Sequence, residues 1–111
     1  MVEVGIARYA IYLANLDPTR GSEIAKTRPV VVVSQDAMNR YLDTIVVCPF
    51  TTQLHSRWRS RIQIVCAGRR AEIAVDQIRT IGKVRLGRQL DRLDGKTAAT
   101  LRRLISEMYG A

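Results

Sequence analysis

The chain has 111 residues, of which 18 are Lys or Arg and 10 are Asp or Glu, so its formal net charge is +8. We expect this length to form one domain without an internal linker. The positive excess favours a polyanionic partner, either nucleic acid or an acidic protein segment. A basic surface that serves only solubility explains the charge equally well, so the charge alone does not decide between the two.

No signal for export or membrane insertion is visible. The first residues lack the basic start and apolar centre of a signal peptide, and no apolar run approaches the ~18 residues of a membrane helix. Cys48 and Cys66 each lie in an apolar run and are expected to be buried, reduced thiols, the alternative being one disulfide between them. We therefore expect a cytoplasmic protein that does not contact a membrane.

Two strands are expected early in the chain, over residues 9–16 and 29–34, joined by a turn-rich loop. The second is almost wholly valine and apolar on both faces, which is typical of a strand buried on both sides. Pro29 has a fixed φ and disfavours the helical region for the residue before it. Arg28 is therefore a guanidinium with little backbone freedom at the beginning of a buried strand.

The middle of the chain is predicted to form a short helix and four more strands. The helix is expected over residues 35–42, and the strands over 44–50, 61–66, 70–75 and 77–81, with Ala67-Gly68 as a turn between 66 and 70. Pro49 cannot donate to a strand ladder, so it should lie at a strand end or on a sheet edge. The segments are too close together for crossover helices, and the sheet should be mainly antiparallel and curled.

The last segment has a helical pattern. Asp94 is a candidate N-cap, and Gly110 is a stop signal. Between them, apolar residues recur at the i, i+3, i+4 and i+7 spacing of an amphipathic helix: Leu101, Leu104, Ile105 and Met108. The fold class is therefore mainly β, a small, strongly bent antiparallel sheet or barrel with a C-terminal α-helix and a short internal helix.

The usual enzyme signatures are absent. His55 is the only histidine, so a pair of imidazoles within one chain is impossible. The sequence has no GxSxG, no P-loop and no metal-spaced cluster of His and Cys. We expect neither a metal nor another cofactor, and any catalysis would rest on arginine, hydroxyl and carboxylate groups.

Groups of this kind occur at three strand ends. Glu23 and Arg28 flank the end of the first loop, Thr-Thr-Gln at 51–53 follows directly on a strand, and Asp76-Gln77 interrupt apolar residues. A strand-end hydroxyl can donate to a phosphoryl oxygen, and arginine presents a bidentate fork to the same group. Each group alone has a structural explanation as an ion pair, a turn or a cap. However, small β domains place their sites in loops at strand ends.

A basic stretch with one aromatic ring lies between the second and third of these places. It reads His55-Ser56-Arg57-Trp58-Arg59-Ser60-Arg61 and contains the only tryptophan of the chain. Arginines neutralise phosphates, and an aromatic ring offers a face on which an unpaired base can stack. We interpret the stretch as a nucleic-acid-binding element, the alternative being a solvated hairpin loop.

The motifs occur in an order that resembles a known family. In chain order they are D-P-T-R-G-S-E from Asp17 to Glu23, Arg28-Pro29, Ser34, P-F-T-T-Q from Pro49 to Gln53, and D-Q-I-R-T-I from Asp76 to Ile81. From about residue 9 to residue 86, this pattern resembles the MazF/PemK family of toxin endoribonucleases of type II bacterial toxin-antitoxin systems.

The resemblance implies an SH3-like barrel of the CcdB/MazF type, a single toxin domain over residues 1–111, and a homodimer with a groove for single-stranded RNA. Cleavage in this family needs no metal. The ribose 2′-OH attacks the adjacent phosphate and leaves a 2′,3′-cyclic phosphate and a 5′-OH. A cognate antitoxin with an acidic C-terminal segment is the implied inhibitor.

Arg28 and Thr51 match the two catalytic positions of the family. Glu23 falls at a position associated with its groove and is assigned as base or orienter, with His55 as the alternative base. The residues expected to bind RNA are Ser34, Thr52, Gln53, His55, Arg57, Trp58, Arg59, Asp76 and Gln77.

The chain departs from the family pattern in the loop before Arg28, where Ile24 and Lys26 stand in place of the frequent Gln and Gly. This change bears on RNA sequence preference and on rate. Two alternatives remain at this point: a CcdB-like toxin that poisons DNA gyrase and is not a nuclease, and a catalytically idle RNA-binding relative. The C-terminal Trp-Gly-Ile of the gyrase poisons is missing here.

Overall fold

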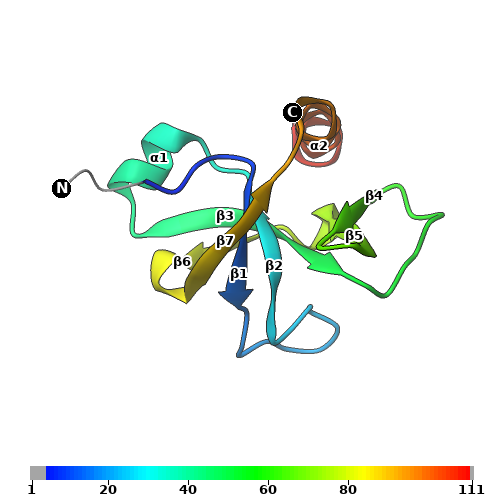
Figure 1. Cartoon of the computed structure of the whole chain (residues 1–111), viewed down its shortest axis with the longest axis horizontal. Coiled ribbons are helices and arrows are strands. Elements are labelled where there is room, and N and C mark those ends of the chain that lie inside the picture. Colours follow the sequence, from blue (N-terminus) through cyan, green and yellow to red (C-terminus); the bar gives the residue numbers. More distant parts are fainter. Residues whose placement is uncertain (1–4, 111) are drawn as a thin grey trace.

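The computed structural model describes residues 5–110, in which seven strands form one curled antiparallel sheet (Figure 1). The strands are β1 (Ala10–Asn15), β2 (Thr27–Val32), β3 (Thr44–Thr51), β4 (Arg61–Cys66), β5 (Arg69–Ala74), β6 (Arg79–Gly82) and β7 (Leu86–Arg92). Their order in the sheet is β4-β5-β3-β2-β1-β7, and β6 pairs with β3. The expected mainly β, strongly bent antiparallel architecture is confirmed.

The helices lie where the sequence predicts them. They are α1 (Asp36–Tyr41) and α2 (Gly95–Tyr109), and the short 3-10 segments are η1 (Val75–Gln77) and η2 (Lys83–Arg85). The Asp94 carboxylate caps α2 by accepting a hydrogen bond from the Thr97 amide at 2.7 Å. At Gly110, which ends α2, a Cβ would lie 2.4 Å from the Ser106 carbonyl oxygen. Within residues 5–110, no helix is long and apolar enough to cross a membrane.

Alternation along β2 divides the core into two clusters. Val30 and Val32 belong to one buried cluster, and Val31 and Val33 to the other, because successive side chains of a strand point to opposite faces. The apolar stripe of α2, with Leu101 fully buried, packs on the second cluster. The valine strand is therefore buried on both faces, as its composition predicts.

Pro49 lies on a central strand, two residues before the strand ends at Thr51, so its expected place at a strand end or on a sheet edge is wrong. β3 pairs along one side with β2, with Pro49 opposite Val30. Along its other side, β3 pairs with β6 as far as Val47 and with β5 from Phe50 onward. Pro49 falls in the gap between these two ladders, where its missing N–H interrupts neither of them.

The sequence pattern does not predict β7, because the side chains of this strand do not alternate regularly between the two faces. Leu86 packs against one core cluster and Leu90 against the other, although residues four apart in a regular strand share a face. Register shifts in the pairing of β7 with β1 account for the change of face. The strand predicted over 77–81 likewise begins two residues later, as β6, because η1 occupies the preceding turn.

Both cysteines are free, but only Cys48 is buried. Burial, reinforced by the charge of Asp76, raises the pKa of the Cys48 thiol to about 12. Cys66 is half-buried, so the expectation of two buried thiols is wrong for it. It ends β4, which is the last strand on its side of the sheet and is covered less than the central strands.

Candidate active site

The beginning of β2 and the end of β3 bring Arg28 and Thr51 into one pocket. These strands are antiparallel with Val30 opposite Pro49, and the same register continued by two residues places Arg28 opposite Thr51. The pocket has a volume of about 170 Å³ and is lined by Arg28, Pro29, Phe50, Thr51, Thr52, Cys66, Ala67, Arg69 and Ala71. One strand pair therefore unites two polar groups that lie far apart in the sequence.

Arg28 is half-buried and held by its own loop. Its Nε donates a hydrogen bond of 2.8 Å to the carbonyl oxygen of Ala25. Within residues 5–110, the ion pairs all involve Arg61, and Arg28 has no carboxylate partner. Its two terminal nitrogens are available to an anionic ligand, and a guanidinium can offer them in parallel to two oxygens of a phosphate.

Thr51 is a buried hydroxyl residue, with 7% of its surface exposed. Its Oγ1 accepts a hydrogen bond of 3.1 Å from the Gln53 amide, which fixes the turn after β3. A hydroxyl that accepts through a lone pair still has its own proton to donate. Thr51 can therefore donate to a phosphoryl oxygen in the pocket without losing the contact that orients it.

Glu23 lies on the exposed loop before β2, and it does not line the pocket. Its Oε1 accepts a long hydrogen bond of 3.4 Å from the Arg20 amide. The same loop is tied to η1 by Gln77, whose Oε1 accepts from the Ile24 amide at 3.0 Å and whose Nε2 donates to the Ser22 carbonyl at 3.3 Å. Gln77 thus anchors the loop that carries Glu23.

Lys26 is one departure from the family pattern, and the structure shows how the loop accommodates it. Its backbone has φ of 68°, in the left-handed region that glycine adopts without strain. Its amide donates to the Asp17 carboxylate at 2.9 Å, and its carbonyl accepts from the Leu16 amide at 2.9 Å. The glycine-like conformation is kept although the residue is lysine, because these contacts close the base of the loop.

Asp76 is not a free carboxylate, because Arg61 contacts it. Nε of Arg61 lies 2.8 Å from Oδ1 of Asp76, and Nη1 of Arg61 lies 3.2 Å from Glu72. Burial raises the pKa of Asp76, but hydrogen bonds from Arg61 and Ser60, with the Arg61 charge, hold that pKa below its usual range. No group of three or more His, Cys, Asp or Glu side chains that could hold a metal ion occurs within residues 5–110.

Glu72 is a buried residue beside the site, and the sequence interpretation missed it. It pairs with Thr51 in the ladder between β5 and β3, and it is 0% exposed. Burial raises the pKa of Glu72, but hydrogen bonds from its three donor groups and the Arg61 charge outweigh this effect and hold the pKa below its usual range. A carboxylate within the apolar run A-E-I-A-V was the signal that could have identified it.

The indole of Trp58 already has partners within the chain. The His55 ring stacks on it with centroids 3.9 Å apart and an interplanar angle of 8°. The Arg61 guanidinium lies 4.6 Å from the ring centroid. Trp58 is still 48% exposed. An RNA base that stacks on the indole must either share the ring with His55 and Arg61 or displace one of them.

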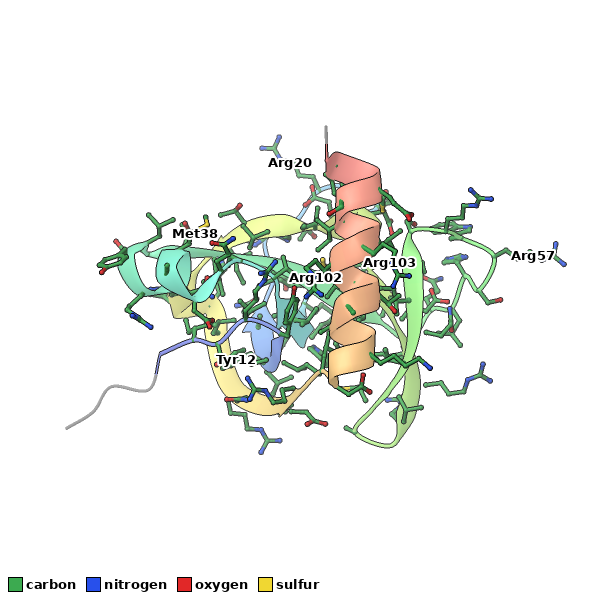
Figure 2. All side chains as sticks on the ribbon, turned by 90° about the horizontal axis from the view of Figure 1, so that it is seen from above. Tyr12, Arg20, Met38, Arg57, Arg102 and Arg103 are labelled. Atoms are coloured by element: carbon green, nitrogen blue, oxygen red, sulfur yellow. The ribbon has the colours of Figure 1, made fainter. Side chains whose placement is uncertain are left out.

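Other predicted RNA-binding residues surround the pocket or project from the loop between β3 and β4. Thr52 lines the pocket, and Gln53 is exposed beside it. Arg57 and Arg59 are exposed, and Figure 2 shows Arg57 extending outward from the molecule. Arg69 at the beginning of β5 is a second guanidinium in the pocket, which the sequence interpretation did not single out.

The structure does not bring Ser34 to this pocket. Ser34 follows the far end of β2, whereas Arg28 lies near its beginning. It is buried, and its Oγ accepts a hydrogen bond of 3.1 Å from the Val46 amide. Its carbonyl accepts from the Asn39 side chain at 2.9 Å. These contacts join β2, α1 and β3, so Ser34 has a structural role here.

Comparison with known proteins places this architecture in a family. The family model described as "PemK-like, MazF-like toxin of type II toxin-antitoxin system" matches residues 7–109. The protein belongs to this family of toxins. A curated relative, Endoribonuclease MazF of Staphylococcus saprophyticus, is 33% identical over 91 residues, covering 78% of this chain and 76% of the relative.

Solved structures share the fold at lower identity. MazF from Deinococcus radiodurans is 20% identical, with a TM-score of 0.85, and the match covers 98% of this chain and 100% of that one. An endoribonuclease in complex with its cognate antitoxin, from Mycobacterial species, is 20% identical, with a TM-score of 0.76 and coverage of 96% and 94%. A MazE-MazF complex from Deinococcus radiodurans is 17% identical, with a TM-score of 0.78 and coverage of 97% and 98%.

Proposed function

We propose that this protein is a sequence-selective endoribonuclease toxin that cleaves single-stranded RNA without a metal. The observation that carries the proposal is the pocket in which Arg28 and Thr51 lie together. Membership of the PemK/MazF family and the relative named Endoribonuclease MazF support it. The net charge of +8 suits a polyanionic substrate.

The reaction is a transfer within the RNA. The 2′ oxygen attacks the adjacent phosphorus as its proton leaves, and the bond from phosphorus to the 5′ oxygen breaks as that oxygen gains a proton. The products are a 2′,3′-cyclic phosphate and a 5′-OH. Arg28 and Thr51 donate hydrogen bonds to the phosphoryl oxygens, whose negative charge is greatest in the transition state, so both groups stabilise it more than the starting diester.

Glu23 is proposed as the base, or as the group that orients the 2′-OH. It is on the loop that leads into Arg28, and the Gln77 contacts tie that loop to η1. For this role, the exposed carboxylate must approach the phosphate when RNA is bound. His55 is the alternative base, and its ring would have to act from its stacked position on Trp58.

We further propose that the toxin acts in the cytoplasm as a homodimer and is neutralised by a cognate antitoxin. Solved structures of similar fold are titled as complexes of MazF with MazE and as an endoribonuclease with its antitoxin. An antitoxin segment with acidic side chains would compete with RNA for the arginines around the pocket. Sedimentation of the purified toxin should give the mass of two chains.

The decisive experiment incubates pure protein with an unstructured RNA in EDTA. Cleavage should occur, and the products should carry a 2′,3′-cyclic phosphate and a 5′-OH. A substrate with one 2′-deoxy nucleotide at the cleaved bond should stay intact, because the attacking oxygen is missing. RNA that is bound but never cut would instead identify an idle relative. In a separate incubation, breakage of supercoiled DNA that requires both this protein and gyrase would identify a gyrase poison.

A further inference from the structure

The loop that follows Thr51 is tied to β5 by one buried carboxylate. Three donor groups converge on Glu72: the His55 amide at 2.9 and 2.8 Å from its two oxygens, Nη1 of Arg61 at 3.2 Å, and Nε2 of Gln63. All three belong to this loop or to β4, which follows it. The carboxylate itself is 0% exposed and lies opposite Thr51 in the strand ladder.

The chemistry of these neighbours favours an ionised acceptor with two oxygens. Each of the three contacts is a donor, and an ionised carboxylate accepts at both oxygens without offering a proton. A glutamine of the same shape keeps one acceptor oxygen but loses the negative charge that pairs with Arg61, and it meets Gln63 with an NH₂ group unless the Gln63 amide turns over. The His55 amide and the Arg61 guanidinium can only donate, and the bond from Arg61 is assisted by charge, so this site favours a carboxylate over an amide.

Two of the donors, the His55 amide and Arg61, connect Glu72 to other residues of the loop. The His55 amide is in the loop backbone, and the His55 ring stacks on Trp58. Arg61 lies over the same indole and also contacts Asp76. Fixing the His55 amide and Arg61 therefore fixes Trp58, together with the short backbone segment that carries Thr52 and Gln53.

We propose that Glu72 is a positioning residue that holds the loop of residues 52–60 as one wall of the RNA groove beside Thr51. The inference rests on the proposed nuclease function and goes beyond it, because Glu72 does not line the pocket. Glu72 acts by preorganisation. A loop that is already ordered does not lose conformational freedom when RNA binds, so RNA binds more tightly.

The test compares Glu72→Gln with Glu107→Gln, an identical change at an exposed position of α2. For Glu72→Gln, we expect KM for a short RNA to rise by about tenfold to a hundredfold with kcat changed less. A variant that merely loses folded protein shows a lower apparent kcat at unchanged KM. Glu107→Gln should match the wild type in both constants.

Trp58 provides a readout that needs no RNA. As the only tryptophan, it reports the loop directly through acrylamide quenching of its fluorescence. The quenching constant should rise toward that of a free tryptophan amide in Glu72→Gln while far-ultraviolet circular dichroism stays native. An unchanged quenching constant with unchanged KM overturns the proposal.

A second variant keeps the proposal falsifiable if Glu72→Gln does not fold. Gln63→Met removes one exposed donor outside the core and should shift KM and quenching in the same direction by a smaller factor. If Gln63→Met leaves both at wild-type values in that case, the proposal is overturned.

If the wild type cleaves no RNA, the nuclease function fails, and the inference of a groove wall fails with it. Increased quenching in Glu72→Gln would then still show that Glu72 orders the loop.

Discussion

Arg28 is oriented from both directions along the chain. Pro29 restricts its backbone, and the Ala25 carbonyl accepts the hydrogen bond of its Nε. The backbone restriction can be read from the Arg-Pro sequence alone. The hydrogen bond to Ala25 cannot, because it depends on how the preceding loop turns back.

We expect Arg28→Ala to lower the rate of RNA cleavage by about 10²- to 10³-fold, because a donor aimed at the developing charge is lost. Arg28→Lys should recover little, since an ammonium group is a point charge and cannot supply two parallel N–H groups. Single-turnover cleavage measures the loss, and urea unfolding checks that stability is kept. Wild-type rates in either variant would remove Arg28 from the catalytic group.

Thr51→Val keeps the shape of the side chain and removes its hydroxyl. We expect kcat to fall by about 10²-fold with KM near the wild-type value, because the donated hydrogen bond matters most in the transition state. Thr51→Ser is the matched control and should keep most of the activity. If the valine variant cleaves as fast as the wild type, the hydroxyl serves only the turn that Gln53 closes.

Glu23→Gln is expected to slow cleavage more than His55→Ala does. The substitution at Glu23 removes a proton acceptor on the loop adjoining Arg28, whereas the His55 ring is engaged with Trp58. A pH-rate profile of each variant is the measurement. A rise in rate over the range in which imidazole titrates, present in the wild type and lost in His55→Ala, would assign the base to His55 instead.

The basic loop between β3 and β4 contains residues held by contacts within the chain and arginines exposed to solvent. Glu72 and Arg61 order the backbone of His55 and the ring of Trp58. Arg57 and Arg59 are exposed. The stacking role predicted for Trp58 stays a prediction, but its ring now has two partners with which a base must compete. The free arginines are the simpler source of RNA affinity.

Replacing Arg57 and Arg59 together by alanine should weaken RNA binding and flatten its salt dependence. Each lost phosphate contact should reduce the slope of log affinity against log salt by about 0.7 for single-stranded RNA. Alanine at both Arg40 and Arg103, which lie on the two helices, removes the same charge as a control. Parallel salt titrations for the wild type and the loop variant would show that the loop is only a solvated turn.

On the scale of the whole molecule, the sheet order determines what the site contains. β3 is the strand that β2, β5 and β6 all pair with. Its end therefore places Thr51 beside Arg28 on one side and beside Glu72 on the other. From η1, Gln77 reaches the loop before β2, and Asp76 reaches Arg61 at the beginning of β4. One short segment thus holds both loops that flank the pocket.

The excess positive charge of the molecule should also make the antitoxin and RNA compete. We expect an acidic antitoxin segment to inhibit cleavage by occupying the groove, with weaker inhibition at higher salt. Titration of RNA binding against the antitoxin peptide, followed by fluorescence anisotropy, measures this competition. A saturated complex that binds RNA as well as the free toxin does would contradict occlusion.

The sequence by itself determined the local features of this protein. The valine strand is buried on both faces, the helix from Asp94 to Gly110 begins and ends where its cap and stop residues predict, and Arg28 is restricted by Pro29. Each of these follows from a period or from a neighbouring residue, so a short window of sequence contains the cause. The mainly β fold followed from the spacing of such windows.

Only the tertiary structure decided which polar groups meet. In the structure, Asp76 pairs with Arg61, and Gln77 hydrogen-bonds to the loop before β2. Ser34 lies away from the pocket, and Glu72 lies opposite Thr51. β7 was not predicted, because register shifts in its pairing with β1 interrupt the alternation of its side chains. The physical reason is that contacts across a sheet depend on strand order and register. These are set by packing the whole core and are not encoded by the residues adjacent to any one site.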